Sequence, residues 1–390
     1  MLLNFKTHIQ LKNLIGKDLI NNDNIAIVEL VKNSVDATSR SIGVHFRGSV
    51  PTSNDSSIII SDNGKGMDIT DITEKWLNIA YSDKKNNTPG KDLYFAGNKG
   101  IGRFSCDRLG MKLDLITRKA NNPIYHLEIN WPAFENADDP AAEIQKVKLI
   151  CNEVDEQFIK NTFNIEIENT GTLLIISSLR SIWSYDEILD LKRSLEKFVN
   201  PNQVFHRGEF TLILVVPDLV ESDSNRPENE KINGAIKNTV FEKLSFNTTY
   251  IEAEKAEGDN TIQFNLFHDG DKVFSMEEIF PNVTTRNHIK IVIFYLNPYK
   301  KAYFKRQTGI RTVDFGSIFL FVNGFRVPPY GDRGDDWLGV DIRKSQGTAR
   351  HLASREILGR IEVYGNEDEF MPVSSREGLK DPSAFSDLKT

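Results

Sequence analysis

The residues with the most direct chemical potential are the glycines of GNKGIGR (97–103), which lead into a helix expected to run through Leu109. Glycines that open a helix leave backbone N–H groups free to bind phosphate, and the helix dipole adds to the attraction. A glycine-rich segment of this kind is also common in surface loops. Whether this segment binds phosphate therefore has to be judged together with the other polar residues of the chain.

Two further segments carry polar residues in a regular arrangement. Glu29, Asn33 and Asp36 have spacings of four and seven residues, which place all three on one face of a helix expected over residues 24–37. Asp62 begins the hexapeptide DNGKGM, directly after the apolar run 58–60, which indicates a buried strand. Each pattern alone is also typical of ordinary structure, a solvated helix side in the first case and a surface turn in the second.

Competing phosphate and metal motifs fit less well. The sequence has no GxxxxGK[ST], so it gives no support for a P-loop. The glycines of residues 97–102 follow the order GxxGxG, and no acidic residue follows at the spacing of a dinucleotide-binding fold. The seven histidines are scattered, and no pair has the spacing of a helical zinc site.

Taken together and in order, the segments resemble the motifs of the GHKL ATPase superfamily, which includes DNA gyrase, the large heat-shock chaperones, histidine kinases and MutL. The matching residues are Glu29, Asn33 and Asp36, then Asp62, Gly64, Gly66 and Met67, then Gly97, Gly100 and Gly102, and finally Gly171 and Thr172. The resemblance covers about residues 10–180 and is closest to MutL-, microrchidia- and chaperone-like bacterial ATPases. It implies an α/β fold (an α+β sandwich), the Bergerat ATP-binding domain, in which helices cover a mixed sheet.

The resemblance also implies roles for the residues of the first helix. The side-chain oxygen of Asn33 would bind Mg²⁺, a cation that prefers oxygen ligands. Glu29, one helical turn earlier, would polarise the attacking water as general base, and this residue favours hydrolysis over phosphotransfer. Asp36 belongs to the same nucleotide-binding set.

Further residues are implied at the two ends of the nucleotide. Asp62 would accept a hydrogen bond from the exocyclic amine of adenine, Gly66 would let the backbone approach the base, and Met67 would pack on its face. Thr172 would support Asp62 from a neighbouring strand, and Gly64 belongs to the same motif. The phosphates would lie against Lys99, Gly100, Ile101 and Gly102. Residues from about 68 to 102 would form a mobile lid.

Hydrophobic periodicity divides the chain into two α/β halves. Strands are expected over 42–46, 58–60, 112–118, 124–130 and 172–179, and helices over 69–79 and 186–199. We place the boundary near residue 182, so that residues 1–182 form the ATP-binding domain and residues 183–390 a transducer-like domain with an insertion at about 218–288. In this second half, residues 210–217 are expected to start a new sheet, strands return at 289–296 and 317–322, and Asn323-Gly324 marks a hairpin turn.

A basic residue that contacts the γ-phosphate is expected in the second domain. The segment SREGL (375–379) resembles the loop that carries such an arginine in the chaperones, so Arg376 is the first candidate for this catalytic role. An arginine suits a bidentate phosphate contact. A surface salt bridge is an equally good interpretation of Arg376. Lys344 is the second candidate, because MutL uses a lysine for this purpose.

Composition narrows the class of protein. The chain has 390 residues and a net charge of -7, which argues against a general nucleic-acid coat. Two cysteines cannot form a disulfide framework, the N-terminus lacks the apolar core of a signal peptide, and no stretch approaches the ~20 apolar residues of a membrane span. We therefore expect a soluble, cytoplasmic protein without a membrane partner.

The function that follows is Mg²⁺-dependent ATP binding and hydrolysis that drives lid closure and formation of a homodimer. By analogy with bacterial relatives, the protein would belong to a defence or DNA-transaction system. The alternative is a nucleotide-gated scaffold or clamp that binds a protein or DNA partner with little turnover. A histidine kinase is disfavoured, since only 28 residues with a single histidine, His8, precede Glu29. The length fits a minimal two-domain ATPase or the motor end of a longer protein.

Overall fold

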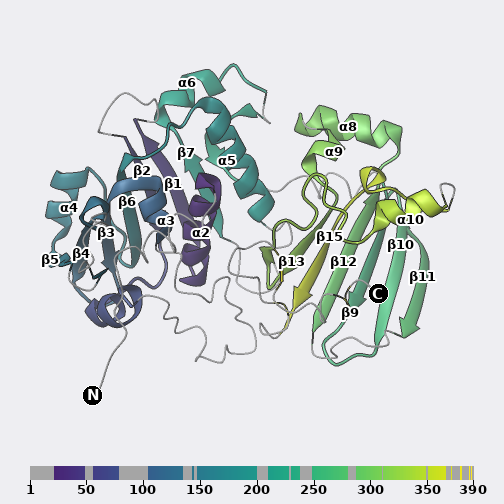
Figure 1. The fold of residues 1–390 in the computed structure, drawn as a ribbon, viewed down its shortest axis with the longest axis horizontal. Coiled ribbons are helices and arrows are strands. Elements are labelled where there is room, and N and C mark those ends of the chain that lie inside the picture. The colour runs from purple at the N-terminus through teal and green to yellow at the C-terminus, as the bar shows by residue number, and fades with distance from the viewer. Residues whose placement is uncertain are drawn as a thin grey trace. The chain divides into compact units, whose positions relative to one another are not determined.

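The computed structural model describes residues 22–48, 56–78, 104–134, 143–144, 147–199, 210–227, 230–237, 248–279, 287–309, 311–347, 350–365, 370, 378–379, 386 and 388. The chain divides into two compact units (Figure 1). The first comprises residues 1–196 and 207–236, and the second comprises residues 197–206 and 237–390. This division lies later in the chain than the expected boundary near residue 182, because segments beyond it join the first sheet.

The first unit is built on an eight-stranded sheet with the order β5-β4-β3-β6-β2-β1-β7-β8. Its strands are β1 (Ser41–Arg47), β2 (Ser57–Asp62), β3 (Gly110–Arg118), β4 (Ile124–Asn130), β5 (Ile150–Val154), β6 (Gly171–Leu179), β7 (Thr211–Val215) and β8 (Gly234–Ala235). The pairing of β1 with β7 is parallel, and the other pairings are antiparallel, so the sheet is mixed.

The position of β7 corrects one expectation. Residues 210–217 do not start a new sheet, because β7 lies beside β1 with Thr211 opposite Ser41. Apolar alternation identifies a strand but carries no information about which strand it pairs with. The other expected strands of this unit are confirmed within a few residues.

Helices cover both faces of this sheet. The helices of the unit are α2 (Asp23–Asp36), α3 (Ser105–Leu109), α4 (Glu156–Phe163), α5 (Tyr185–Phe198) and α6 (Val220–Asp223), with shorter helical turns at Asp71–Trp76, Trp131–Phe134 and Pro217–Leu219. Ile159 of α4 packs with Ile59 and Leu173 in one apolar cluster. Residues alternate between the two faces along a strand, so Ile59 and Asp62, three residues apart on β2, point to opposite faces. Asp62 accepts a hydrogen bond from Ser34 of α2. The helix α2 therefore lies on the face opposite α4.

The helix expected over residues 24–37 is confirmed as α2. Its N-cap is Asn22, whose side chain accepts a hydrogen bond from the backbone N–H of Asn24 at 2.7 Å, as is usual for an N-cap asparagine. The buried side includes Ile27, Leu30 and Val31, which repeat at helical spacing. The helix is thereby held against the sheet by its apolar stripe.

The second unit contains a seven-stranded sheet with the order β11-β10-β9-β12-β15-β13-β14. Its strands are β9 (Thr249–Lys255), β10 (Thr261–His268), β11 (Asp271–Ile279), β12 (His288–Tyr295), β13 (Ile318–Val322), β14 (Phe325–Arg326) and β15 (Ile357–Tyr364). The expected hairpin turn at Asn323-Gly324 is confirmed, because it joins the paired strands β13 and β14. The segment 218–288, expected as an insertion, supplies β8 to the first sheet and β9, β10 and β11 to the second.

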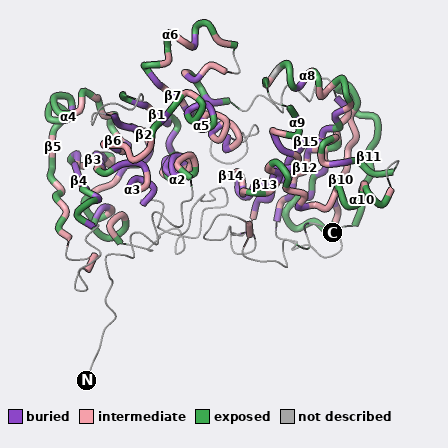
Figure 2. The backbone as a smooth tube through the Cα atoms, turned by 45° about the horizontal axis from the view of Figure 1, so that its top comes forward, coloured by how far each residue is buried: buried purple, intermediate pink, exposed green. Residues whose placement is uncertain are grey.

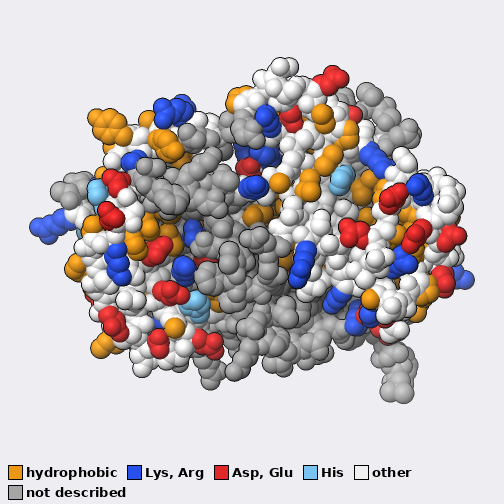
Figure 3. Space-filling model, turned by 180° about the vertical axis from the view of Figure 1, so that it is seen from behind, with side chains coloured by type: hydrophobic (Ala, Val, Ile, Leu, Met, Phe, Trp, Pro, Cys, Tyr) orange, Lys and Arg blue, Asp and Glu red, His pale blue; other side chains and the backbone are white. Residues whose placement is uncertain are grey.

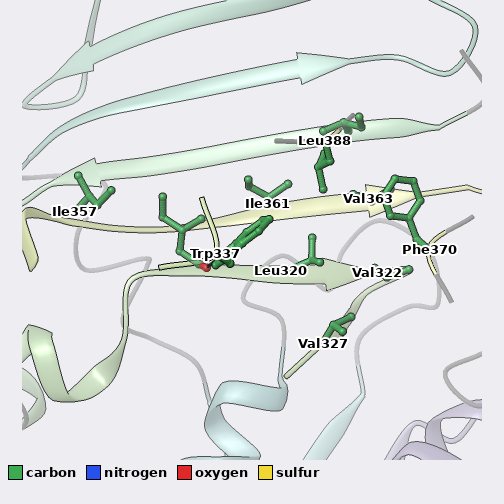
Figure 4. Close-up of a cluster of buried hydrophobic side chains, with 11 residues drawn as sticks. Leu320, Val322, Val327, Trp337, Ile357, Ile361, Val363, Phe370 and Leu388 are labelled. Carbon is green, nitrogen blue, oxygen red and sulfur yellow. Dashed lines mark hydrogen bonds between the residues drawn. The ribbon is translucent and has the colours of Figure 1, made fainter. Parts of the chain in front are cut away.

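Aromatic and aliphatic side chains fill both sides of this second sheet. On one side Trp337 lies against β13 and donates its indole N–H to the carbonyl of Ile318 at 2.7 Å (Figure 4). The other side carries a cluster that includes Phe304 and Phe315 from α8 (Pro298–Thr308) and α9 (Thr312–Phe315). A third helix, α10 (Val340–Gln346), follows Trp337. The irregular segment 323–341 is therefore fixed to the sheet by its tryptophan.

Burial differs between the strands of the second sheet. The strands β13 and β15 are buried along their whole length, whereas β11 is exposed along its length (Figure 2). Acidic and basic side chains are interspersed over the face seen in Figure 3. Among the described residues, no helix is long and apolar enough to cross a membrane.

Candidate functional site

Three adjacent strands of the first sheet bring Asp62, Thr172 and Thr117 side by side. Asp62 at the end of β2 lies opposite Thr172 of β6, and Thr172 lies opposite Thr117 of β3. Residues directly opposite in an antiparallel ladder share a face and have Cβ atoms ~5 Å apart. The row faces α2, because Ser34 of that helix donates to Oδ2 of Asp62 at 3.0 Å. Segments far apart in the sequence thus converge on one site.

The carboxylate of Asp62 is the most heavily hydrogen-bonded group in this row. Its Oδ1 accepts from the hydroxyl of Ser39 at 3.1 Å and from the backbone N–H of Gly64 at 2.9 Å. Burial raises the pKa of Asp62, and the hydrogen bonds from Gly64, Ser34 and Ser39 act in the opposite direction. The residue as a whole is partly exposed, and its carboxylate is fixed in place by these hydrogen bonds.

Two glycines, one in the loop after Asp62 and one at the start of β6, have backbone conformations that other residues rarely adopt. Gly66 has φ +63°, and a Cβ there would lie 1.8 Å from the carbonyl oxygen of Arg118. Gly171 has φ +135°, and a Cβ there would lie 2.0 Å from the carbonyl oxygen of Asp62. Both positions require glycine, since the backbone of a neighbouring strand passes too close for a side chain. The loop is therefore held directly against the end of β3, and the start of β6 against the end of β2.

A buried hydroxyl completes this contact. Thr117 is fully buried, and its Oγ1 accepts from the backbone N–H of Met67 at 2.9 Å. The same oxygen lies 3.0 Å from the carbonyl oxygen of Gly171 and 3.1 Å from Oγ1 of Thr172. Thr117 thus connects the loop, the strand β6 and the row of polar side chains.

The polar stripe of α2 is not a solvated surface. Glu29 and Asp36 are 8% and 4% exposed, whereas Asn33 between them is exposed. Ionisable carboxylates are rarely buried without a specific role or partner. Oε1 of Glu29 accepts a hydrogen bond from Nζ of Lys32 at 2.9 Å, which restrains its rotamer. The helix therefore offers a restrained, buried carboxylate one turn before an accessible amide.

An ion-pair cluster anchors the segment that follows the loop. Nζ of Lys119 lies 2.6 Å from Asp68 and 2.7 Å from Asp71, and Lys75 lies 2.8 Å from Asp71. The hydrogen bond from Lys119 lowers the pKa of Asp68. Burial acts to raise the pKa of Asp71, but hydrogen bonds from Lys119 and Lys75 outweigh it and hold this pKa well below its usual range. The cluster joins the end of β3 to the first helical turn after Met67.

The structure leaves several expected site residues untested. Lys99, Gly100, Ile101, Gly102 and Arg376 lie outside the described residues, as does most of the segment expected to be a lid. Lys344, the second candidate for the γ-phosphate contact, lies in α10, and its Nζ is 3.4 Å from Oε2 of Glu356. Among the residues that the structure describes, no group of three His, Cys, Asp or Glu side chains could hold a metal ion.

Sequence reasoning missed four residues that the fold brings to this site: Ser34, Ser39, Thr117 and Lys119. A signal was present for two of them. Ser34 stands on the apolar stripe of α2, seven residues after Ile27, and is buried there. Thr117 is a hydroxyl at the end of a buried run of β3, residues 113–117. A polar residue at a core position needs a partner, and here the partners are Asp62 and Met67.

Comparison with known proteins agrees with this geometry. Residues 20–162 match the family model described as histidine kinase-, DNA gyrase B- and HSP90-like ATPase. A search of curated proteins found no match to the chain. The matched segment includes α2, β2 and the loop after Asp62, and it supplies β1 to β5 of the mixed sheet, whereas β6, β7 and β8 come from later in the chain. The family match therefore places residues 20–162 of this chain with the ATPase domains of the GHKL superfamily.

Proposed function

We propose that this protein binds ATP together with Mg²⁺ and hydrolyses it, with Glu29 as the general base. The observation that carries this proposal is the pair formed by buried Glu29 and exposed Asn33 on α2. The same helix orients the row of polar side chains through the hydrogen bond from Ser34 to Asp62. One element would then position both the reacting end and the base-binding end of the nucleotide.

The base of the nucleotide would lie against Asp62. The hydroxyls of Ser34 and Ser39 and the backbone N–H groups of Gly64 and Thr172 donate to this carboxylate, and a bound base would add one more donor at Oδ2. The exocyclic amine of adenine supplies such a donor. Thr172 is partly exposed beside Asp62, and Met67 is partly exposed at the start of the following segment. Gly66 would allow the backbone to approach the base, and Gly64 would hold the carboxylate through its N–H.

The metal and phosphates would lie beside α2, close to Asn33 and Glu29. Mg²⁺ accepts amide oxygens and is commonly bound by few protein ligands together with substrate phosphates, which suits the exposed side chain of Asn33. Bound Mg²⁺ would neutralise phosphate charge. Glu29 would orient a water molecule and accept its proton, and Asp36 would belong to the same polar surface. We assign phosphate contacts to Lys99, Gly100, Ile101 and Gly102 by the resemblance of their motif.

The nucleotide would also drive a conformational cycle. In this proposal the lid closes over ATP, the transducer-like domain supplies Arg376 or Lys344 to the γ-phosphate, and two chains associate. The support is the presence of a second α/β unit after the nucleotide-binding domain. Solution mass with and without a nonhydrolysable ATP analogue tests this step. An unchanged mass and shape would count against the dimer.

Hydrolysis is tested with Glu29→Gln, which keeps the shape of the side chain and removes its basicity. We expect phosphate release from ATP in Mg²⁺ to fall by about 100-fold or more, the usual effect of losing a general base, while binding of a nonhydrolysable analogue changes little. Glu166→Gln is the matched control, because Glu166 is exposed and lies after α4. Equal hydrolysis by the wild-type protein and Glu29→Gln would refute the role of Glu29. Tight binding without any turnover in the wild-type protein would favour a nucleotide-gated scaffold or clamp.

A further inference from the structure

We infer that the buried hydroxyl of Thr117 sets the specificity of the proposed base pocket by fixing the direction of the hydrogen bond made by Thr172. The inference rests on the proposed function, since it concerns which purine lies against Asp62. Thr117 itself is fully buried and would not touch the nucleotide. It acts as a positioning residue through Thr172, which is partly exposed.

The contacts of Thr117 leave its hydroxyl no freedom. A hydroxyl has one proton to donate and two lone pairs to accept with. The N–H of Met67 is only a donor, so it occupies one lone pair of Oγ1 at 2.9 Å. The carbonyl of Gly171 is only an acceptor, so it takes the single proton at 3.0 Å. The remaining contact, at 3.1 Å to Oγ1 of Thr172, must therefore use the second lone pair of Thr117.

This assignment determines whether the hydroxyl of Thr172 can donate or accept a hydrogen bond with a bound base. Since Thr117 accepts in the contact between the two hydroxyls, Thr172 donates its only proton into the interior of the sheet. The oxygen of Thr172 is left with lone pairs alone. Asp62 lies directly opposite Thr172 in the ladder and is itself an acceptor when ionised. The accessible part of the row therefore presents two hydrogen-bond acceptors on adjacent strands.

Two adjacent acceptors match an amino group that carries two hydrogens. The exocyclic amine at position 6 of adenine has this arrangement, with one hydrogen for Asp62 and one for Thr172. A 6-oxopurine such as guanine places a carbonyl oxygen at the same position. That oxygen would meet two acceptors and find no donor, which costs more than the loss of a single hydrogen bond. The hydroxyl of Thr117 thus extends adenine selection from one residue to two.

The test compares Thr117→Val with Thr117→Ser. Valine keeps the shape of threonine but cannot accept from Thr172, whose proton is then released toward the pocket. We expect the ratio of ATP affinity to GTP affinity to fall by about tenfold in Thr117→Val, the value of roughly one neutral hydrogen bond. Thr117→Ser keeps the hydroxyl and should retain the wild-type ratio. Dissociation constants are measured for both nucleotides by isothermal titration calorimetry with Mg²⁺.

The ratio of ATP affinity to GTP affinity distinguishes a role of Thr117 in base selection from a merely structural role. Thr117 also holds the backbone of Met67, so Thr117→Val weakens the loop, but a loosened loop should lower the affinity for both nucleotides equally. Thr211→Val is the matched control, because Thr211 is an exposed position on β7 of the same sheet. Thermal unfolding of each variant establishes that it is folded.

The possible outcomes are distinct. A ratio that falls in Thr117→Val and is retained in Thr117→Ser supports the inference. If the wild-type protein binds ATP and both variants keep its ratio, the inference is overturned while the proposed function stands. A fall in the ratio for both variants also overturns it, because the hydroxyl is then not the determinant. If the wild-type protein binds neither nucleotide, the proposed function fails and the inference fails with it.

Discussion

Replacing Asp62 by asparagine changes one carboxylate oxygen into an amide nitrogen and leaves the shape of the side chain almost unaltered. The fold should tolerate this change. With the amide oxygen at the position of Oδ1, the donors Ser39 and Gly64 both keep their acceptor. The hydroxyl of Ser34 loses Oδ2 but can turn to accept from the amide, and the carbonyl oxygen of Leu30 lies 3.4 Å away as another acceptor.

The expected cost to the fold follows from these contacts. Hydrogen bonds to an ionised group contribute about 1 kcal/mol more than neutral ones, so two retained bonds lose about 2 kcal/mol together. Removing a buried charge offsets part of this loss, because burial raises the pKa of Asp62 and so disfavours its ionised form. The free energy of unfolding of the first unit should therefore fall by no more than about 2 kcal/mol.

Nucleotide binding should respond far more strongly than stability. The amide of Asp62→Asn would direct N–H groups at the exocyclic amine of adenine, so a charge-assisted hydrogen bond is lost and two donors face each other. We expect ATP to bind with at least 3 kcal/mol less free energy, which is more than ~100-fold in dissociation constant. Binding of GTP should weaken less, because the new amide can donate to its carbonyl.

The assay is calorimetric titration of both nucleotides, with thermal unfolding of the same samples. Asp190→Asn is the matched control, because it makes the same chemical change at an exposed position of α5, where Asp190 pairs only at the surface with Arg193. ATP affinity within threefold of the wild-type value in a folded Asp62→Asn protein would refute the reasoning that Asp62 contacts the base.

Two further substitutions test the supports of the site. Gly66→Ala should destabilise the first unit by about 2 kcal/mol or more and weaken ATP binding, because its Cβ would collide with the carbonyl of Arg118, whereas Gly258→Ala has nothing within 4 Å and should cost only about 1 kcal/mol of backbone strain. Urea unfolding monitors both, and equal costs would refute the close approach. Lys119→Met should cost about 1 kcal/mol at pH 7. Since Asp68 and Asp71 have lowered pKa values, their contribution is present above the unfolded pKa near ~4 and is lost as the pH falls through the folded values, so the difference between the unfolding curves should vanish in acid. A difference independent of pH would contradict this.

The sequence alone was sufficient to predict most helices and strands of the first domain and its fold class. The helix α2, the strands β1, β2, β3, β4 and β6, and the loop after Asp62 each follow from a local pattern, namely apolar periodicity or closely spaced glycines. The strand β5 was not predicted, because its residues are mostly exposed and show no such pattern. Such patterns depend on neighbours within a few residues, so they can be read from the chain directly. The order of the motifs then indicated the nucleotide-binding family, which the match over residues 20–162 confirms.

The environment of the site depended on the tertiary structure. The sequence marked Glu29 and Asp36 as a polar stripe, but only the packed structure shows that they are buried while Asn33 is exposed. Ser34 and Thr117 had no role assigned from the sequence, and the structure makes them partners of Asp62 and Met67.

The same limit explains the misplaced sheet boundary. The alternation in residues 210–217 identifies β7 as a strand, but its partner is β1, which lies far away in the sequence. Strand pairing is set by contacts between distant segments and by the burial that they achieve together, and neither quantity is encoded in the alternation of a single strand. The sequence alone therefore determined the chemical groups and the local elements, whereas the tertiary structure decided which groups meet, because sheet pairing and burial are properties of the whole fold.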